Sequence, residues 1–172
     1  IYTPENGNRF NLTTSSFING EEGLNEHGLA VAMTFVLTEL GKIKAGFNSC
    51  FTVRYLLEKA NTTEQALNLL MQLPIASNYN ILIADKSGKM VVVECTPNIK
   101  KIREAKSVDD GYLVCTVNSF ISDELKPYDF AKGDDYHSYT RYSVVMDNCI
   151  KNVKNADPVV ETQKLLKGEY LS

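Results

Sequence analysis

The sequence has no tryptophan, only two histidines (His27 and His137), and four cysteines that never form a CxxC pair. It therefore lacks the ligand spacing of a structural zinc site, and we predict no metal. No apolar run approaches the roughly 20 residues that cross a bilayer. The longest run, residues 29–37, is interrupted by Thr34. Neither sign of charge dominates, with 18 Lys and Arg against 21 Asp and Glu. Nucleic acid is thus a poor candidate for a partner, and no membrane partner is expected.

The composition that remains is typical of a soluble globular protein. Hydrophobic residues make up 44% and charged residues 23% of the 172 residues, a length that fits one domain, 1–172. We interpret the cysteines as reduced thiols in a cytoplasmic protein, although their even number still permits disulfides. The sequence starts with Ile1 rather than Met, and Tyr170 and Leu171 begin another apolar element after Gly168. We therefore expect a piece of a longer chain.

Hydrophobic spacing and turn residues predict an α+β fold. Residues 29–37 are typical of a strand covered on both faces, and Thr62 and Gln65 have the spacing of a capping box at a helix start. The predicted order is strand 11–18, turn 19–28, strand 29–37, helix 50–60, helix 63–73, hairpin 79–85 and 89–95, strands 100–105 and 112–117, helix 138–151 and helix 158–167. Strands and helices come in blocks, which favours α+β layers over a doubly wound parallel sheet.

The residues alone offer few complete catalytic sets. A dyad of Cys115 and His137 would define a cysteine hydrolase, and Cys115→Ser would test this alternative. Its competing interpretation is that Cys115 packs in a strand. The acidic pairs 109–110 and 134–135 could bind cations, but turn carboxylates of this kind are usually solvated. From the residues alone, the function stays open within the class of soluble α+β domains.

Four segments carry a resemblance to a known family. Residues 23–32, Gly-Leu-Asn-Glu-His-Gly-Leu-Ala-Val-Ala, resemble the G-M-N-E-x-G-L-x-V segment of two groups of N-terminal-nucleophile hydrolases. These groups are the acyl-CoA:6-aminopenicillanic acid acyltransferase-like proteins and the bile-salt (choloylglycine) hydrolases. Segments 53–66, 76–94 and 116–142 follow in the order that the family has. Each motif is weak alone, and together they cover residues 23–145.

The resemblance implies a fold and a reaction. The fold would be the αββα four-layer sandwich, with two antiparallel sheets between helix layers, and this chain would be its central to C-terminal portion. The reaction would be hydrolysis of a linear amide C–N bond, or acyl transfer. It would use an N-terminal cysteine freed by autoproteolysis, whose own α-amine serves as the base. The substrate would be an N-acyl amide or peptide-like compound, with no cofactor.

The resemblance also implies roles for five residues. Asn118, in segment 116–120, resembles the family asparagine that donates a hydrogen bond to the oxyanion of the tetrahedral intermediate. Arg141 resembles the arginine beside the nucleophile, where its charge would favour a thiolate. Thr34, Phe35 and Phe120 fall in the substrate-binding region. Phe35 stands where bile-salt hydrolases have a second asparagine, which favours the acyltransferase-like branch.

The nucleophile itself is missing from the printed sequence. The family cysteine lies upstream of segment 23–32, and none of the residues before Asn25 is a cysteine. We therefore expect this chain alone to be catalytically incomplete and to pair with the missing N-terminal segment of the same protein. A homo-oligomer is left open. The alternative function is a non-catalytic binding or assembly module on the same scaffold. We interpret Asn25 and Glu26 as structural, because Asn side chains cap turns.

Overall fold

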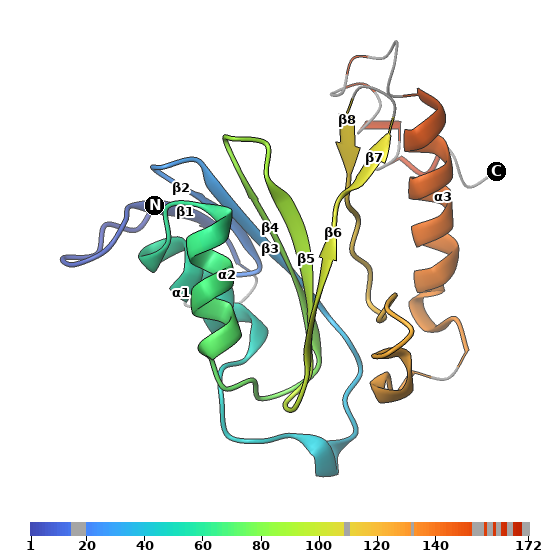
Figure 1. Cartoon of the computed structure of the whole chain (residues 1–172), viewed down its shortest axis with the longest axis horizontal. Coiled ribbons are helices and arrows are strands. Elements are labelled where there is room, and N and C mark those ends of the chain that lie inside the picture. Colours follow the sequence, from blue (N-terminus) through green and yellow to red (C-terminus); the bar gives the residue numbers. More distant parts are fainter. Residues whose placement is uncertain are drawn as a thin grey trace.

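A computed structural model of the chain describes residues 1–14, 20–108, 111–131 and 133–152, with positions 157, 160, 163–164 and 167–169 beyond them. Its centre is a six-stranded antiparallel sheet in which each strand pairs with the next one along the chain (Figure 1). The strands are β1 (Phe10–Thr13), β2 (Glu22–Asn25), β3 (Leu29–Phe35), β4 (Tyr79–Asp85), β5 (Met90–Cys95) and β6 (Lys100–Glu104). The connection from β3 to β4 carries two α-helices.

These helices, α1 (Ser49–Lys59) and α2 (Thr63–Gln72), cover one side of the sheet, which we call the inner face (Figure 1). Asn48 caps α1, because its side chain accepts from the backbone N–H of Phe51 at 2.9 Å. Thr62 caps α2 as predicted, accepting from the Gln65 N–H at 3.3 Å. The other half of the predicted capping box differs: the Gln65 side chain accepts from the Asn61 N–H at 2.9 Å, not from Thr62. Both helix starts are therefore fixed locally.

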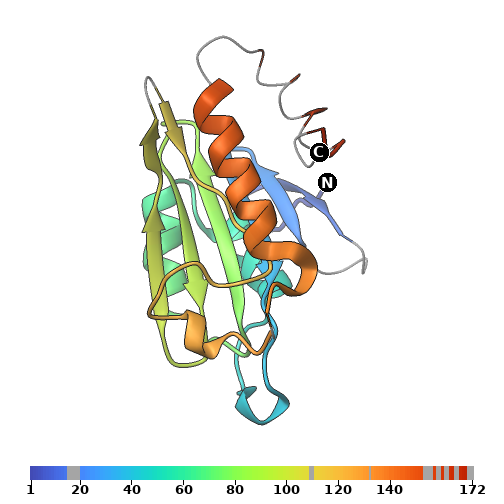
Figure 2. The same ribbon diagram turned by 90° about the vertical axis from the view of Figure 1, so that its right-hand side faces the viewer.

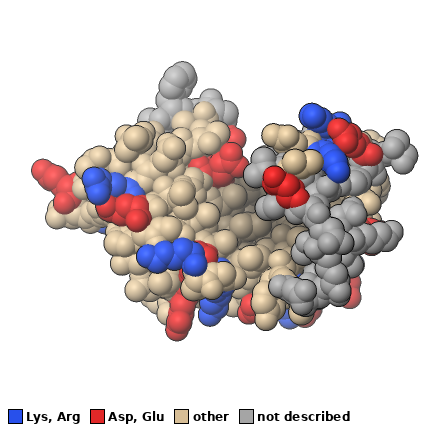
Figure 3. Space-filling view, turned by 90° about the horizontal axis from the view of Figure 1, so that it is seen from above, with Lys and Arg blue, Asp and Glu red and all other residues tan. Residues whose placement is uncertain are grey.

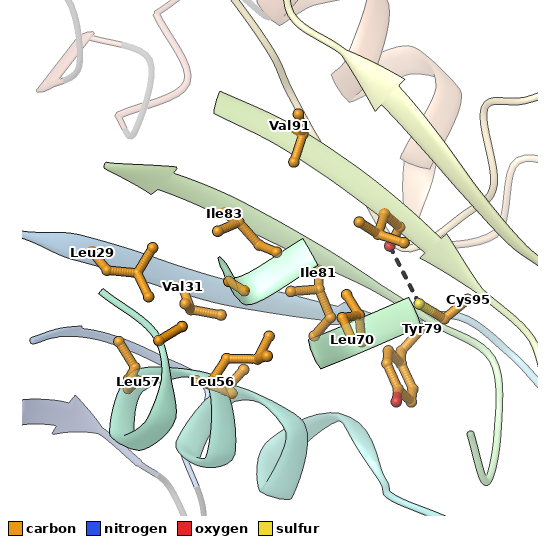
Figure 4. Packing of buried hydrophobic residues seen from close by; sticks show 14 of the residues in the cluster. Leu29, Val31, Leu56, Leu57, Leu70, Tyr79, Ile81, Ile83, Val91 and Cys95 are labelled. Atoms are coloured by element: carbon orange, nitrogen blue, oxygen red, sulfur yellow. Dashed lines mark hydrogen bonds between the residues drawn. The ribbon is translucent and has the colours of Figure 1, made fainter. Parts of the chain in front are cut away.

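The main hydrophobic core lies between the inner face and the two helices (Figure 4). Alternate strand residues point into it, as the two-residue period of a strand requires. The fully buried side chains that meet there include Leu29, Leu56, Leu57, Leu70, Tyr79, Ile81, Ile83, Val91 and Cys95. The hydroxyl of Tyr79 reaches the hydroxyl of Thr52 at 2.9 Å, which satisfies a polar group inside this core. Burial raises the pKa of the Cys95 thiol, so it stays protonated and acts as a packing group.

The opposite side, which we call the outer face, is covered by described segments that follow β6 (Figure 2). A two-stranded ribbon of β7 (Lys106–Val108) and β8 (Gly111–Leu113) continues from β6, and helix α3 (Ser138–Asn152) lies in front of the sheet, on the side away from α1 and α2. Between them, segment 114–131 packs on the outer face and closes a second cluster of Val36, Phe120 and Leu125. The described residues also form three short 3₁₀ helices, η1 (Leu40–Lys42), η2 (Lys126–Tyr128) and η3 (Asp135–His137).

The α+β fold and most of the predicted elements are confirmed, but the polar stretch 19–28 was wrongly predicted as a turn. Its middle forms β2, which pairs with β1 on one side and β3 on the other. Gly23 permits this close pairing, because a Cβ atom there would clash with the Asn11 carbonyl oxygen. Strand 29–37 is also shorter than predicted and is fully covered on one side only. Leu29 and Val31 are buried in the core, whereas Ala30, Ala32 and Thr34, which point to the other side, are only half-buried.

Other boundaries differ for local reasons. The strand predicted over 11–18 spans Phe10–Thr13, and residues 15–19 lie outside the described residues. The strand predicted over 112–117 is reduced to β8, because residues beyond it are tied to the outer face by side chains instead of a strand ladder. The helix predicted over 158–167 lies mostly outside the described residues. Of the expected second sheet, the described part of the chain forms β7 and β8.

The face of the molecule seen in Figure 3 carries both signs of charge. In the view from above, acidic and basic side chains are interspersed on that face without a continuous patch of one sign (Figure 3). In the described part of the chain, no helix has both the length and the apolar character needed to span a membrane.

Candidate active site

A row of polar side chains crosses the outer face of the sheet. Thr34 on β3 lies opposite Asn80 on β4, and Asn80 lies opposite Glu94 on β5. Asn80 and Glu94 are fully buried although they stand within otherwise apolar strands. Buried polar groups need partners, and here the partners come from segment 114–131.

Glu94 and its partner Arg103 hold this segment at two points, before residue 116 and after residue 120. The Glu94 carboxylate accepts from the backbone N–H of Ile121 at 2.8 Å and from the N–H and hydroxyl of Ser122. It also pairs with Arg103 on β6, Nε to Oε1 at 2.8 Å. Arg103 in turn donates from Nη2 to the carbonyl oxygen of Cys115 at 2.8 Å. One buried ion pair therefore fixes the chain on both sides of residues 116–120.

Asn80 and Thr34 hold the middle of the same stretch. The Asn80 amide nitrogen donates to the carbonyl oxygens of Val117 at 2.9 Å and Ser119 at 3.2 Å. The Thr34 hydroxyl donates to the Val117 carbonyl at 2.7 Å and contacts the hydroxyl of Thr116 at 3.1 Å. These bonds replace a strand ladder, and they flank Asn118 on both sides.

Asn118 is held by both of its amide atoms. Its Nδ2 donates to the Phe35 carbonyl oxygen at 3.1 Å, and its Oδ1 accepts from Arg141 Nη2 at 2.9 Å. An amide nitrogen carries two hydrogens, so this arrangement commits one and leaves the second for another acceptor. The guanidinium polarises the amide through Oδ1, which makes the remaining N–H a stronger donor.

Arg141 reaches Asn118 because of an unusual turn before α3. Tyr136 and His137 both have positive φ angles, 59° and 50°, which L-residues seldom adopt. The Tyr136 carbonyl accepts from Arg141 Nε at 3.0 Å, and its ring meets the exposed Phe35 ring edge to face at 5.7 Å. The turn is secured by Asp134. Its carboxylate accepts from the hydroxyl and N–H of Thr140 and the N–H of Tyr139, and these bonds lower its pKa.

A groove of about 360 Å³ opens beside this amide. It lies where β3 ends, so Asn118 closes one side of it and the exposed ring of Phe35 lies at its surface. Its lining consists of Glu21, Glu22, Met33, Thr34, Phe35 and Asn118. The arrangement presents an oriented N–H donor, a nearby fixed cation and a partly apolar wall in one place.

Four of the five residues expected at the site come together. Thr34, Phe35 and Asn118 line the groove, and Arg141 joins this group through its hydrogen bond to Asn118 Oδ1. Phe120 is elsewhere: its side chain is fully buried in the second cluster and is not among the residues that line the groove. Phe120 is a large apolar side chain, and it is stabilised by burial against Val36 and Leu125.

The sequence patterns predict no role for Asn80, Glu94 or Arg103. Together with Thr34, Asn118 and Arg141 they form what we call the outer-face network. The available signal was a single polar residue inside a buried apolar strand, as in Tyr-Asn-Ile-Leu-Ile and Val-Val-Val-Glu-Cys. Such a residue implies a buried partner, although its sequence position does not say which one.

The interpretation of Asn25 and Glu26 as structural agrees with their contacts. Asn25 donates to the carbonyl oxygens of Leu57 and Ala60 at the end of α1 and accepts from the N–H groups of His27 and Leu29. Glu26 forms a surface ion pair with Arg9 at 2.8 Å. Neither residue lines the groove. In the part of the chain that the structure describes, no group of three or more His, Cys, Asp or Glu side chains is arranged to hold a metal ion.

Comparison with solved structures supports the fold. Two variants of the conjugated bile acid hydrolase from Clostridium perfringens are 16% and 18% identical to this chain, with TM-scores of 0.54 and 0.53. The matches cover 87% and 90% of this chain and 58% and 60% of that protein. A penicillin V acylase from Agrobacterium tumefaciens is 26% identical, covering 50% of this chain and 29% of that one, with a TM-score of 0.41. The chain thus spans less than two thirds of the length of each. No curated protein matches the sequence.

The family assignment comes from a sequence profile that matches nearly the whole chain, residues 3–170. The profile describes acyl-coenzyme A:6-aminopenicillanic acid acyl-transferase. This match agrees with the resemblance of segments 23–145 and with the fold shared with the bile acid hydrolase. The chain belongs to the acyl-coenzyme A:6-aminopenicillanic acid acyl-transferase family.

Proposed function

We propose that this chain supplies the oxyanion-binding part of an enzyme that cleaves or transfers the acyl group of a linear amide. The observation that carries the proposal is the geometry of Asn118. Its amide is fixed by the Phe35 carbonyl and by Arg141, beside a groove, with one N–H left to donate. A donor that is oriented before the reaction costs no reorganisation when negative charge develops on the substrate oxygen.

The reaction follows from the family resemblance. A cysteine at the N-terminus of the mature enzyme, outside the printed sequence, would give its thiol proton to its own α-amine and add to the amide carbonyl. An α-amine has an ordinary pKa of about 7.7–8.0, which suits a base at neutral pH. The carbonyl oxygen becomes the oxyanion and accepts from Asn118 Nδ2. Collapse transfers the proton to the leaving amine and leaves a thioester, which water or an acceptor amine then cleaves.

The test uses the protein expressed from its whole natural reading frame. N-acyl amides are screened for release of amine, starting with penicillin V and conjugated bile acids, the compounds named for the structural neighbours. Asn118→Ala should lower kcat by roughly 10²- to 10³-fold and leave KM nearly unchanged, because the lost bond forms in the transition state.

The matched control is Asn98→Ala, an exposed asparagine that accepts from Lys44 and does not line the groove. It should retain full activity. A loss of kcat in Asn118→Ala that merely follows a loss of folded protein, read by circular dichroism, would contradict the oxyanion role. Intact mass after iodoacetamide treatment tests the nucleophile. If no chain with a labelled N-terminal cysteine is found and no amide is cleaved, the binding or assembly module becomes the better function.

A further inference from the structure

We propose that Asn80 is a positioning residue for Asn118, which it places without touching substrate. The effect of Asn80 on the reaction rests on the proposed function. The effect of Asn80 on the position of Asn118 rests only on the contacts that Asn80 makes. Asn80 lies on β4, is fully buried, and donates to the backbone on both sides of Asn118, at Val117 and Ser119.

The orientation of the Asn80 amide is fixed by its partners. Carbonyl oxygens only accept hydrogen bonds, so the NH₂ group must face Val117 and Ser119. Nδ2 also lies 3.2 Å from the hydroxyl of Thr34, which itself donates to Val117. Two donors from two neighbouring strands therefore converge on one carbonyl, next to the residue that carries the oxyanion donor.

Residues 114–118 need such support because they belong to no strand. Glu94 and Arg103 fix the ends of this stretch at Ser122 and Cys115, and these contacts do not involve Asn80. Loss of the Asn80 side chain should thus leave the segment docked but free to shift in its middle. A shift there moves Asn118 relative to the Phe35 carbonyl and Arg141.

A second observation favours a role beyond stability. Among the residues that the structure describes, Asn80 Oδ1 is buried and has no hydrogen-bond partner. An unpaired buried oxygen is destabilising, and an apolar side chain of the same size would avoid it. The asparagine at position 80 thus supplies an amide nitrogen that binds the backbone on both sides of Asn118, although its buried oxygen lowers the stability of the protein.

Asn78, the residue directly before β4, provides a matched control. It is also buried, and its Nδ2 donates to two backbone carbonyls, Leu37 at 3.1 Å and Tyr128 at 2.7 Å. These carbonyls do not flank Asn118. Asn78→Leu and Asn80→Leu therefore remove the same kind of contact, and only the second removes support from the proposed site.

The first measurement needs no substrate. The side-chain NH₂ resonances of Asn118, identified by their loss in Asn118→Ala, are recorded by ¹⁵N NMR in the full-length protein. Asn80→Leu should shift or broaden these signals, while Asn78→Leu leaves them in place. Unchanged Asn118 signals in Asn80→Leu would overturn the proposal whether or not the protein proves to be an amide hydrolase.

The second measurement uses kinetics. Asn80→Leu should lower kcat by roughly 10- to 100-fold with KM little changed, as expected for a misplaced catalytic group. Asn78→Leu should keep kcat per folded molecule. Asn80→Ser, which is smaller and retains one hydroxyl donor, should fall between wild type and Asn80→Leu. If Asn80→Leu and Asn80→Ser both fail to fold, the residue is structural and the proposal is wrong. Shifted Asn118 signals without any amidase activity in wild type would refute the function and leave the positioning intact.

Discussion

The two faces of the central sheet are stabilised in different ways. The inner face is apolar and packs against α1 and α2 through side chains such as Leu56 and Ile81. The outer face is held to segment 114–131 by the outer-face network, in which Glu94 alone takes three donors from that segment. Apolar packing has little directional preference, whereas hydrogen bonds have defined lengths and angles. The inner face therefore supplies stability, and the outer face fixes the positions of Asn118 and Arg141.

The difference predicts how each face responds to substitution. A core residue can be replaced by another of similar volume at modest cost, because neighbours repack. A buried charge has no such tolerance, since removing one partner leaves the other unpaired. Variants on the two faces should thus separate loss of stability from loss of geometry at the site.

The largest effect is expected for Glu94→Ala on the outer face. Arg103, whose side chain is 15% exposed, would lose its ion pair, and the N–H groups of Ile121 and Ser122 would lose their acceptor. We expect the free energy of unfolding to fall by about 4 kcal/mol, measured by urea denaturation. The Asn118 side-chain NMR signals should move as well.

Glu94→Gln is the control for shape, because it keeps the volume and one acceptor oxygen. It should lose clearly less stability than Glu94→Ala. A cost below about 1 kcal/mol for Glu94→Ala would mean that water replaces the carboxylate, and the outer face would then not be a fixed polar network.

A smaller effect, of about 3 kcal/mol, is expected for Leu56→Ala in the inner core. Leu56 is fully buried on α1, so its loss leaves a cavity between helix and sheet. Urea denaturation should show the loss, while the Asn118 signals stay in place because no bond to segment 114–131 changes. Phe51→Ala removes a larger side chain from the exposed side of the same helix and should cost less than about 1 kcal/mol. Movement of the Asn118 signals in Leu56→Ala would show that the two faces are coupled.

Much of the inner face could be predicted from the sequence, because its signals are local. Two nearly continuous apolar runs joined by a short glycine turn marked β4 and β5, and the helical spacing of apolar residues marked α1 and α2. Strand β2 could not be found in this way. It contains Gly23 and charged Glu22, and it exists because β1 and β3 pair on both sides.

The candidate site was predictable only in part, since its contacts are long-range. Resemblance pointed to Asn118 and Arg141, and the structure places them 2.9 Å apart, Nη2 to Oδ1. The supporting residue Asn80 lies 37 positions from the Val117 carbonyl to which it donates. No spacing rule links such positions. Their partnership depends on how segment 114–131 crosses the outer face, which the strand pattern does not encode.

The smallest effect is expected at Asp85, which joins the end of β4 to the start of α2 on the inner face. Its carboxylate accepts from the Thr63 N–H at 2.7 Å and from the Ser87 N–H at 2.8 Å. Partial burial alone would raise the pKa of Asp85, but the bonds from Ser87 and Thr63 outweigh it and lower the pKa from 3.8 to about 2. A carboxyl group with a lowered folded-state pKa stabilises the protein above its unfolded pKa. That stabilisation is lost as the pH falls from about 4 to about 2.

Asp85→Asn should therefore lower the free energy of unfolding by about 1 kcal/mol at pH 7, the usual value for a helix N-terminal acceptor, and by close to nothing at pH 2. Urea denaturation of both proteins at pH 7, 4 and 2 measures the difference. A gap that stays constant with pH would mean that the hydrogen-bond geometry of Asp85, and not its charge, supports α2.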